Sequence, residues 1–104
     1  EEKFQNTTLR QVIKLQHALL IAIFQDYAIT RKTDLKTLTE QRAKRFIESA
    51  LSKDIALKNK MIGLIVGQFT LEEFDFYKNS SSEFNKRIFT IIKKRLKDSL
   101  LELS

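Results

Sequence analysis

Hydrophobic residues recur along this chain at the three- and four-residue spacing that one face of an α-helix requires. In residues 43–51 the apolar positions follow the series i, i+3, i+4, i+7 and i+8, and they are Ala43, Phe46, Ile47, Ala50 and Leu51. Proline is absent and glycine occurs only twice, so little interrupts a helix. The pattern predicts an all-α fold, a single-domain helical bundle of four to five helices over residues 1–104.

The first predicted helix is the longest. Thr8 and Gln11 have the spacing of a capping box, so we expect a helix from Thr8 to about Ile29, roughly 33 Å long. Its inner side is expected to carry Leu9, Val12, Ile13, Leu20, Ile23 and Tyr27. The segment ALLIAIF, residues 18–24, is apolar on every face. It predicts either the central helix of the monomer or a helix that a second copy of the chain covers in part.

Polar segments divide the remaining helices. Residues 30–39 are rich in threonine and predict a connection, and the next helix begins after Thr37 or Thr39 as N-cap. A further start is predicted at Ser52 or Asp54.

The two glycines lie four positions apart in the segment MIGLIVGQFTLEEF. Just after them, Thr70 and Glu73 form a predicted capping box, and Phe69 and Phe74 have the spacing of a hydrophobic staple. A helix that begins at Thr70 requires the previous helix to end first. Gly67 is therefore expected at C′ in the left-handed conformation. Gly63 stays inside a helix, where it predicts a close helix crossing or a contact across a dimer.

The C-terminal part is predicted to hold a short helix over Leu71 to Lys78 and a last helix that runs to about Leu103, with Ser80 and Glu83 as its capping box. The lengths of these two helices allow a helix-turn-helix motif. Acidic residues on the first of them and the lack of glycine in the turn make that alternative the weaker one.

Residues that could carry chemistry are few. The chain has no cysteine and a single histidine, His17, which has no carboxylate one helical turn away. Glu72, Glu73 and Asp75 fall in a first helical turn, where carboxylates stabilise the helix dipole more often than they bind a metal. We therefore predict no catalytic residue, no cofactor, no metal and no small-molecule substrate, and no enzyme.

The net charge of +6 is concentrated in two groups of basic residues. One group lies on the polar side of the last helix and comprises Lys86, Arg87, Lys93, Lys94 and Lys97. The other surrounds the start of the second helix and comprises Lys32, Lys36, Arg42, Lys44 and Arg45. If the two groups share a surface, they would attract nucleic-acid phosphates or an acidic partner. The alternative is a solvated face that keeps the protein soluble.

The function predicted from these features is that of a non-enzymatic protein–protein interaction or adaptor module that forms a homodimer. Self-association is expected through Leu20, Ile23, Phe24, Tyr27 and Gly63. The alternative is a regulatory nucleic-acid-binding domain that uses the basic side of the last helix. The longest apolar run has seven residues, Ala18 to Phe24, too few to span a bilayer. We expect a cytoplasmic protein, and the start at Glu1 without methionine is consistent with a fragment of a longer chain.

Overall fold

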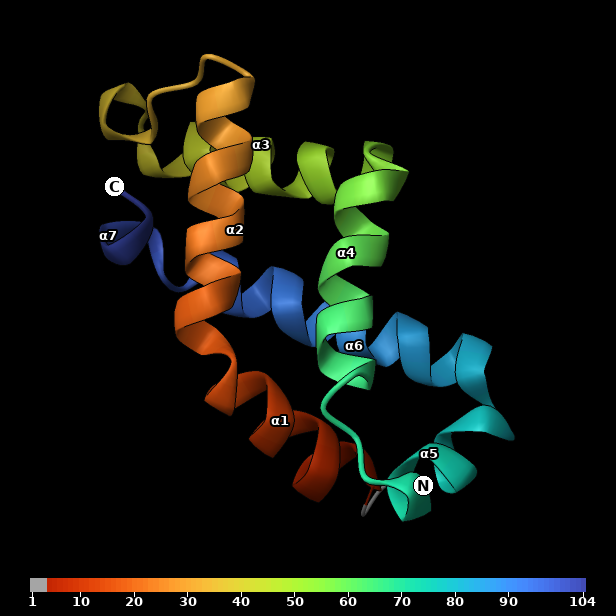
Figure 1. Ribbon diagram of the computed structural model, residues 1–104. Coiled ribbons are helices and arrows are strands. Elements are labelled where there is room, and N and C mark those ends of the chain that lie inside the picture. The colour runs from red at the N-terminus through yellow and green to blue at the C-terminus, as the bar shows by residue number, and fades with distance from the viewer. Residues whose placement is uncertain (1–3) are drawn as a thin grey trace.

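Helices account for nearly all of the chain in the computed structural model, which describes residues 4–104 and, within them, side chains from Thr7 onward (Figure 1). The fold is all-α, as predicted. The elements are the π-helix η1 (Phe4–Leu9), α1 (Arg10–Leu15), α2 (His17–Thr30), the 3-10 turn η2 (Leu35–Thr37), α3 (Glu40–Lys53), α4 (Ile55–Val66), α5 (Leu71–Lys78), α6 (Ser81–Lys97) and α7 (Leu100–Leu103). The described residues thus form seven α-helices rather than four to five.

One extra helix arises because the predicted long first helix is broken at Gln16. The arms on either side of Gln16 are bent by 61°, and the helical path already begins at Phe4, so the predicted start at Thr8 is wrong as well. The physical reason is visible in the sequence. In a straight helix Gln16 and His17 would lie three and four residues beyond Ile13, on the apolar stripe. The bend lets Ile13 and Leu20 both enter the core without burying this polar pair.

The last predicted helix is also divided. α6 ends at Lys97, and a separate turn of helix, α7, follows Ser99. The Ser99 hydroxyl donates to the carbonyl of Arg95, a local bond that competes with helix continuation. The predicted capping box at Ser80 is wrong too. Ser80 occupies the N-cap position of α6, but its side chain makes no capping hydrogen bond.

The helices pack around one core. In Figure 1, α3 crosses behind α2 and ends at the start of α4, whereas α6 crosses behind both α2 and α4. α6 contacts α1, α3, α4, α5 and α7. Most of α2 therefore has cover on one side only. The largest fully buried side chains are Leu9, Ile13, Leu20, Phe24, Ile47, Leu51, Met61, Ile65, Phe84, Ile88, Ile92 and Leu96. The helical spacing of the sequence predicts five of these positions, which are Leu9, Ile13, Leu20, Ile47 and Leu51.

Three helix starts follow from side-chain caps that the sequence predicted. The hydroxyl oxygen of Thr39 accepts from the amide of Arg42 at 3.2 Å and begins α3. Thr70 and Glu73 form the complete capping box of α5, with bonds of 3.1 and 2.8 Å. Of the alternatives Ser52 and Asp54, the chain uses Asp54.

Asp54 has two roles at the corner between α3 and α4. Its carboxylate accepts from the Leu57 amide at 3.0 Å as the N-cap of α4, and it pairs with Arg31 at 2.8 Å. The Leu57 amide and then the Arg31 guanidinium lower the pKa of the Asp54 carboxyl. The hydrogen bond to Asp54, and after it the nearby Tyr27, raises the pKa of Arg31. The end of α2 is thereby tied to the start of α4.

The two glycines differ from prediction in conformation and surroundings. α4 ends at Val66 as expected, but Gly67 has φ −63° and ψ −15°, so the predicted left-handed stop is wrong. A Cβ at Gly67 would lie 3.0 Å from the carbonyl oxygen of Gly63, which explains the small residue there. A Cβ at Gly63 would meet nothing within 4 Å. The predicted close helix crossing at Gly63 within the monomer is therefore wrong.

The left-handed stop is found instead at Lys32, which has φ 55°. The Lys32 amide donates to the carbonyl of Ile29 and the Thr33 amide to that of Ala28, both at 2.9 Å. These two bonds are those of a Schellman motif at the end of α2. A lysine thus occupies a position that glycine would fill without a steric cost.

Among residues 4–104, no single helix is long and apolar enough to cross a membrane. Residues 7–15 and 17–30 reach that length and apolarity only when the two bent arms are counted together.

Candidate functional site

α2 has an apolar side that no other helix of residues 4–104 covers. We define the α2 outer face as the exposed residues Ala18, Leu19, Ala22, Asp26 and Ile29. Leu19 is 46% exposed and Ile29 is 73% exposed. Asp26 is the one charged residue of this set, whereas the solvent side of a helix in a globular protein is usually polar throughout.

The residues predicted for self-association occupy three different environments. Leu20 and Phe24 are buried in the core, so the structure corrects their assignment to an external surface. Ile23 and Tyr27 are half-buried and pack against the core. Gly63 is exposed on α4, next to the exposed polar residues Asn59 and Lys60.

The predicted basic stripe of α6 is partly neutralised within the molecule. Lys93 and Lys97 both donate to the carboxylate of Glu48 on α3, at 2.8 and 2.7 Å. Lys93 first, then Lys97, lowers the pKa of the Glu48 carboxyl to about 2. Sequence reasoning missed this contact because Glu48 reaches α6 only through the crossing of the two helices.

Two more of the predicted basic residues have carboxylate partners. Lys94 pairs with Asp98 at 3.1 Å, and Lys44 pairs with Glu40 at 3.2 Å. The two basic groups do meet, since Lys44 and Lys97 line one cavity, but Glu40, Asp98 and Glu102 line it as well. Within the described part of the chain, six residues of the two basic groups have no ion pair: Lys32, Lys36, Arg42, Arg45, Lys86 and Arg87.

The segment that would read bases in a helix-turn-helix is engaged internally. Asn85 of α6 accepts a hydrogen bond from the hydroxyl of Tyr77 on α5. The rings of Phe76 and Phe84 also meet across the α5–α6 joint, with centroids 5.8 Å apart. These contacts fix the joint and use a side chain that base recognition would need.

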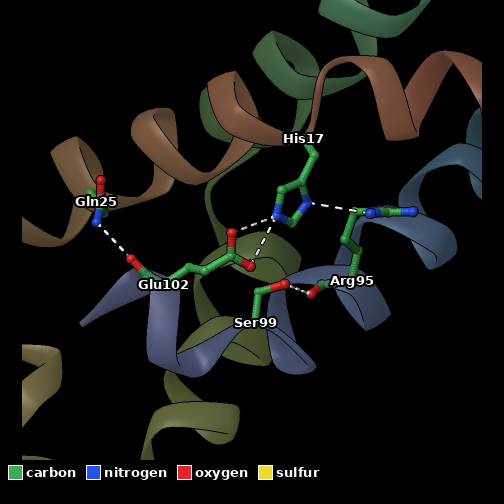
Figure 2. Close-up of polar contacts among 5 residues, drawn as sticks. All are labelled: His17, Gln25, Arg95, Ser99 and Glu102. Atoms are coloured by element: carbon green, nitrogen blue, oxygen red, sulfur yellow. Dashed lines mark hydrogen bonds and ion pairs between the residues drawn. The ribbon is translucent and has the colours of Figure 1, made fainter.

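His17 stands at the centre of a polar network between α2, α6 and α7 (Figure 2). Its Nε2 lies 3.0 Å from both carboxylate oxygens of Glu102, and its Nδ1 lies 3.3 Å from Nη1 of Arg95. Gln25 adds a bond from its amide nitrogen to the carbonyl of Glu102 at 3.0 Å. No local pattern indicates this network, because Glu102 and Arg95 lie 85 and 78 positions from His17 along the chain.

The chemistry of Arg95 assigns the proton on His17. A guanidinium nitrogen carries only donor hydrogens, so Nδ1 of His17 must be the acceptor. The imidazole proton then lies on Nε2 and is donated to Glu102. His17 thus connects a cation to a carboxylate through its ring, and the Arg95 guanidinium has no direct carboxylate partner among the described residues.

Two adjoining cavities lie between α1 and α6. One has about 340 Å³ and the other about 290 Å³, and Arg10 and Arg95 line both. We define the α1–α6 cleft by the basic residues that line these cavities, which are Arg10, Lys14, Arg87, Lys94 and Arg95. Asp98 is the single carboxylate of the lining. Of these five residues, the sequence predicts only Arg87 and Lys94 as part of a basic surface. Arg10, Lys14 and Arg95 join them because the bend at Gln16 brings α1 against α6.

Acidic side chains do not gather into a metal site. Within the described residues, no three His, Asp or Glu side chains converge as metal ligands would. Glu73 caps α5, and Asp75 pairs with Lys78 at 3.2 Å.

Comparisons with known proteins give no match: no family model, no curated protein and no solved structure is significantly similar to this chain.

Proposed function

We propose that the protein is a small, non-enzymatic helical interaction module that associates with a second copy of itself through the α2 outer face. The observation that carries the proposal is the exposure of Leu19 and Ile29 on a helix side with a single charge. Apolar side chains that gather on an exposed helix face are typical of an interaction surface.

The composition of the face favours a helix as the partner. Ala18 and Ala22 lie one turn apart, and their small side chains allow another helix backbone to come close. Leu19 and Ile29 flank them and supply apolar area. Two identical faces of this kind can pair around a two-fold axis, which is the commonest symmetry of soluble homodimers.

The test is the mass in solution of Ala22→Glu, measured by light scattering at increasing concentration. Ala22 is exposed in the monomer, so the change leaves the core intact. The unmodified chain is expected at about twice the monomer mass and the variant at the monomer mass. Ala56→Glu, at an exposed alanine of α4, is the matched control and should remain dimeric. A strictly monomeric unmodified chain at high concentration would overturn the proposal.

Nucleic-acid binding through the C-terminal helix is the weaker alternative. Lys93 and Lys97 share Glu48, and Lys94 is paired with Asp98, so much of the predicted stripe already has intramolecular partners. If this alternative holds, binding of duplex DNA should fall steeply with salt and should disappear when Lys86 is reversed together with Lys93 and Lys97.

A further inference from the structure

We infer that the α1–α6 cleft is a binding site for the phosphate group of a small organic phosphate. The first argument is charge. Five basic side chains line the two adjoining cavities against one carboxylate, that of Asp98, which is already paired with Lys94 at 3.1 Å. Such an excess of positive charge in a concave site raises the local concentration of anions.

The second argument is the chemistry of the donors. Arg10, Arg87 and Arg95 each carry five N–H groups in a planar fork that matches the oxygens of a phosphate. The Nε atoms of Arg87 and Arg95 are buried and have no hydrogen-bond partner in the described part of the chain. Buried donors are rarely left in this state in folded proteins. Because these two Nε atoms are closed off from solvent, a ligand in the cleft would meet both guanidiniums at their terminal nitrogens.

The third argument is that one arginine of the cleft is held in place. Nη1 of Arg95 is 3.3 Å from Nδ1 of His17, and His17 is anchored in turn by Glu102. The contact to His17 orients Arg95 without an ion pair between the guanidinium and a carboxylate of the described residues. We regard His17 as a positioning residue for Arg95.

The lining also indicates which groups would recognise the ligand. The hydroxyl of Thr90 donates to the carbonyl of Lys86, and that of Ser99 donates to the carbonyl of Arg95. Since these hydroxyl hydrogens are already used, recognition in the larger cavity depends on its basic side chains. A cavity of about 340 Å³ is at the lower end of the size of ligand pockets, which suits a compact phosphate compound.

The experiment is a calorimetric titration of the protein with inorganic pyrophosphate at low ionic strength. Arg10→Gln and Arg87→Gln each remove one guanidinium from the cleft. Each change should weaken pyrophosphate binding about tenfold or more, because hydrogen bonds to charged groups are strong. Arg45→Gln changes the net charge equally at an exposed arginine of α3 and should change affinity less than twofold. Thermal unfolding of each variant establishes that it is folded.

Two results would overturn the inference. One is the absence of saturable pyrophosphate binding. If a short single-stranded oligonucleotide then still binds, the cleft is part of an extended nucleic-acid surface and not a compact phosphate site. The other is an equal loss of affinity in Arg45→Gln, because net charge alone would then explain binding. The α2 outer face is not involved, so this test and that of self-association fail or succeed independently.

Discussion

His17 and Glu102 lie 85 positions apart in the sequence, yet Nε2 of the imidazole is 3.0 Å from both carboxylate oxygens. The contact joins the start of α2 to α7, whose residue Leu103 is buried. Because Arg95 occupies the other ring nitrogen, the same histidine also positions α6. One side chain thus relates three helices.

Removing the carboxylate should loosen α7 without unfolding the protein. In Glu102→Gln we expect hydrogen exchange of the Leu103 and Ser104 amides, which bond to Ser99 and Leu100, to become faster by up to about fivefold. The limit reflects the roughly 1 kcal/mol that a hydrogen bond contributes to stability. Glu72→Gln, at an exposed glutamate of α5, is the control and should leave these amides unchanged. Unchanged exchange in Glu102→Gln would mean that Leu103 alone holds α7.

Acid should weaken the fold through Glu48. Its pKa is about 2 in the folded protein, against an ordinary value of 4.5, so between these values the unfolded state binds more protons. Stability from this group is complete above about pH 4.5 and is lost as the pH falls toward 2. Glu48 is 44% exposed, so we expect the loss to be about 1 kcal/mol rather than the full value that the shift implies.

The measurement is urea unfolding at several pH values between 2 and 6 for the unmodified chain and Glu48→Gln. The variant should be less stable near pH 6 and should lose less stability toward pH 2. Glu83→Gln, an exposed glutamate of α6, should follow the unmodified chain. Parallel curves for Glu48→Gln and the unmodified protein would show that the two lysines do not act on Glu48 in solution.

Gly63→Ala should stabilise the protein. The new Cβ would meet no atom within 4 Å, and alanine favours a helix interior by about 0.5 to 1 kcal/mol over glycine. The melting temperature should rise by about 4 °C in a domain of this size. Gly67→Ala is the comparison, because its Cβ would press on the carbonyl oxygen of Gly63, and it should stabilise less or destabilise. A lower melting temperature for Gly63→Ala would imply a close neighbour at Gly63, such as a second copy.

Lys32→Gly should also stabilise the protein, for the opposite reason. Lys32 has φ 55°, and relief of this left-handed conformation is expected to outweigh the greater freedom of glycine in the unfolded chain by about 0.5 kcal/mol. Lys32→Ala removes the same charge but keeps the steric cost, so it is the matched control. Chemical unfolding of both variants measures the difference. Equal stability of the two would contradict a strained left-handed stop at the end of α2.

The sequence was most informative where a structural cause is local. The spacing of apolar residues identified the buried side of α3, and caps at Thr39 and Thr70 depend only on residues three positions ahead. The bend was also within reach, since Gln16 and His17 interrupt the apolar stripe of a straight helix.

The candidate sites depend on helix crossings, which no local pattern specifies. Glu48 meets Lys93 across 45 positions, and Arg95 meets His17 across 78. The apolar run of α2 correctly indicated a helix with little polar surface. Because the run is apolar on every face, the spacing of its residues does not show which of them face inward. Leu20 and Phe24 are buried in the core, so the interface that we propose lies on the opposite side of α2.

The pairing of α1 with α6 and of α2 with α7 has a consequence for how the protein is made. α1 and α2 are synthesised before α6 and α7, so the core cannot close until α6 has left the ribosome. Until α6 emerges, the inner apolar residues of α2 have no lasting cover. Nascent chains of this protein should therefore depend on chaperones that shield apolar segments, and a stalled chain that lacks α6 should be degraded rather than accumulate as a folded fragment.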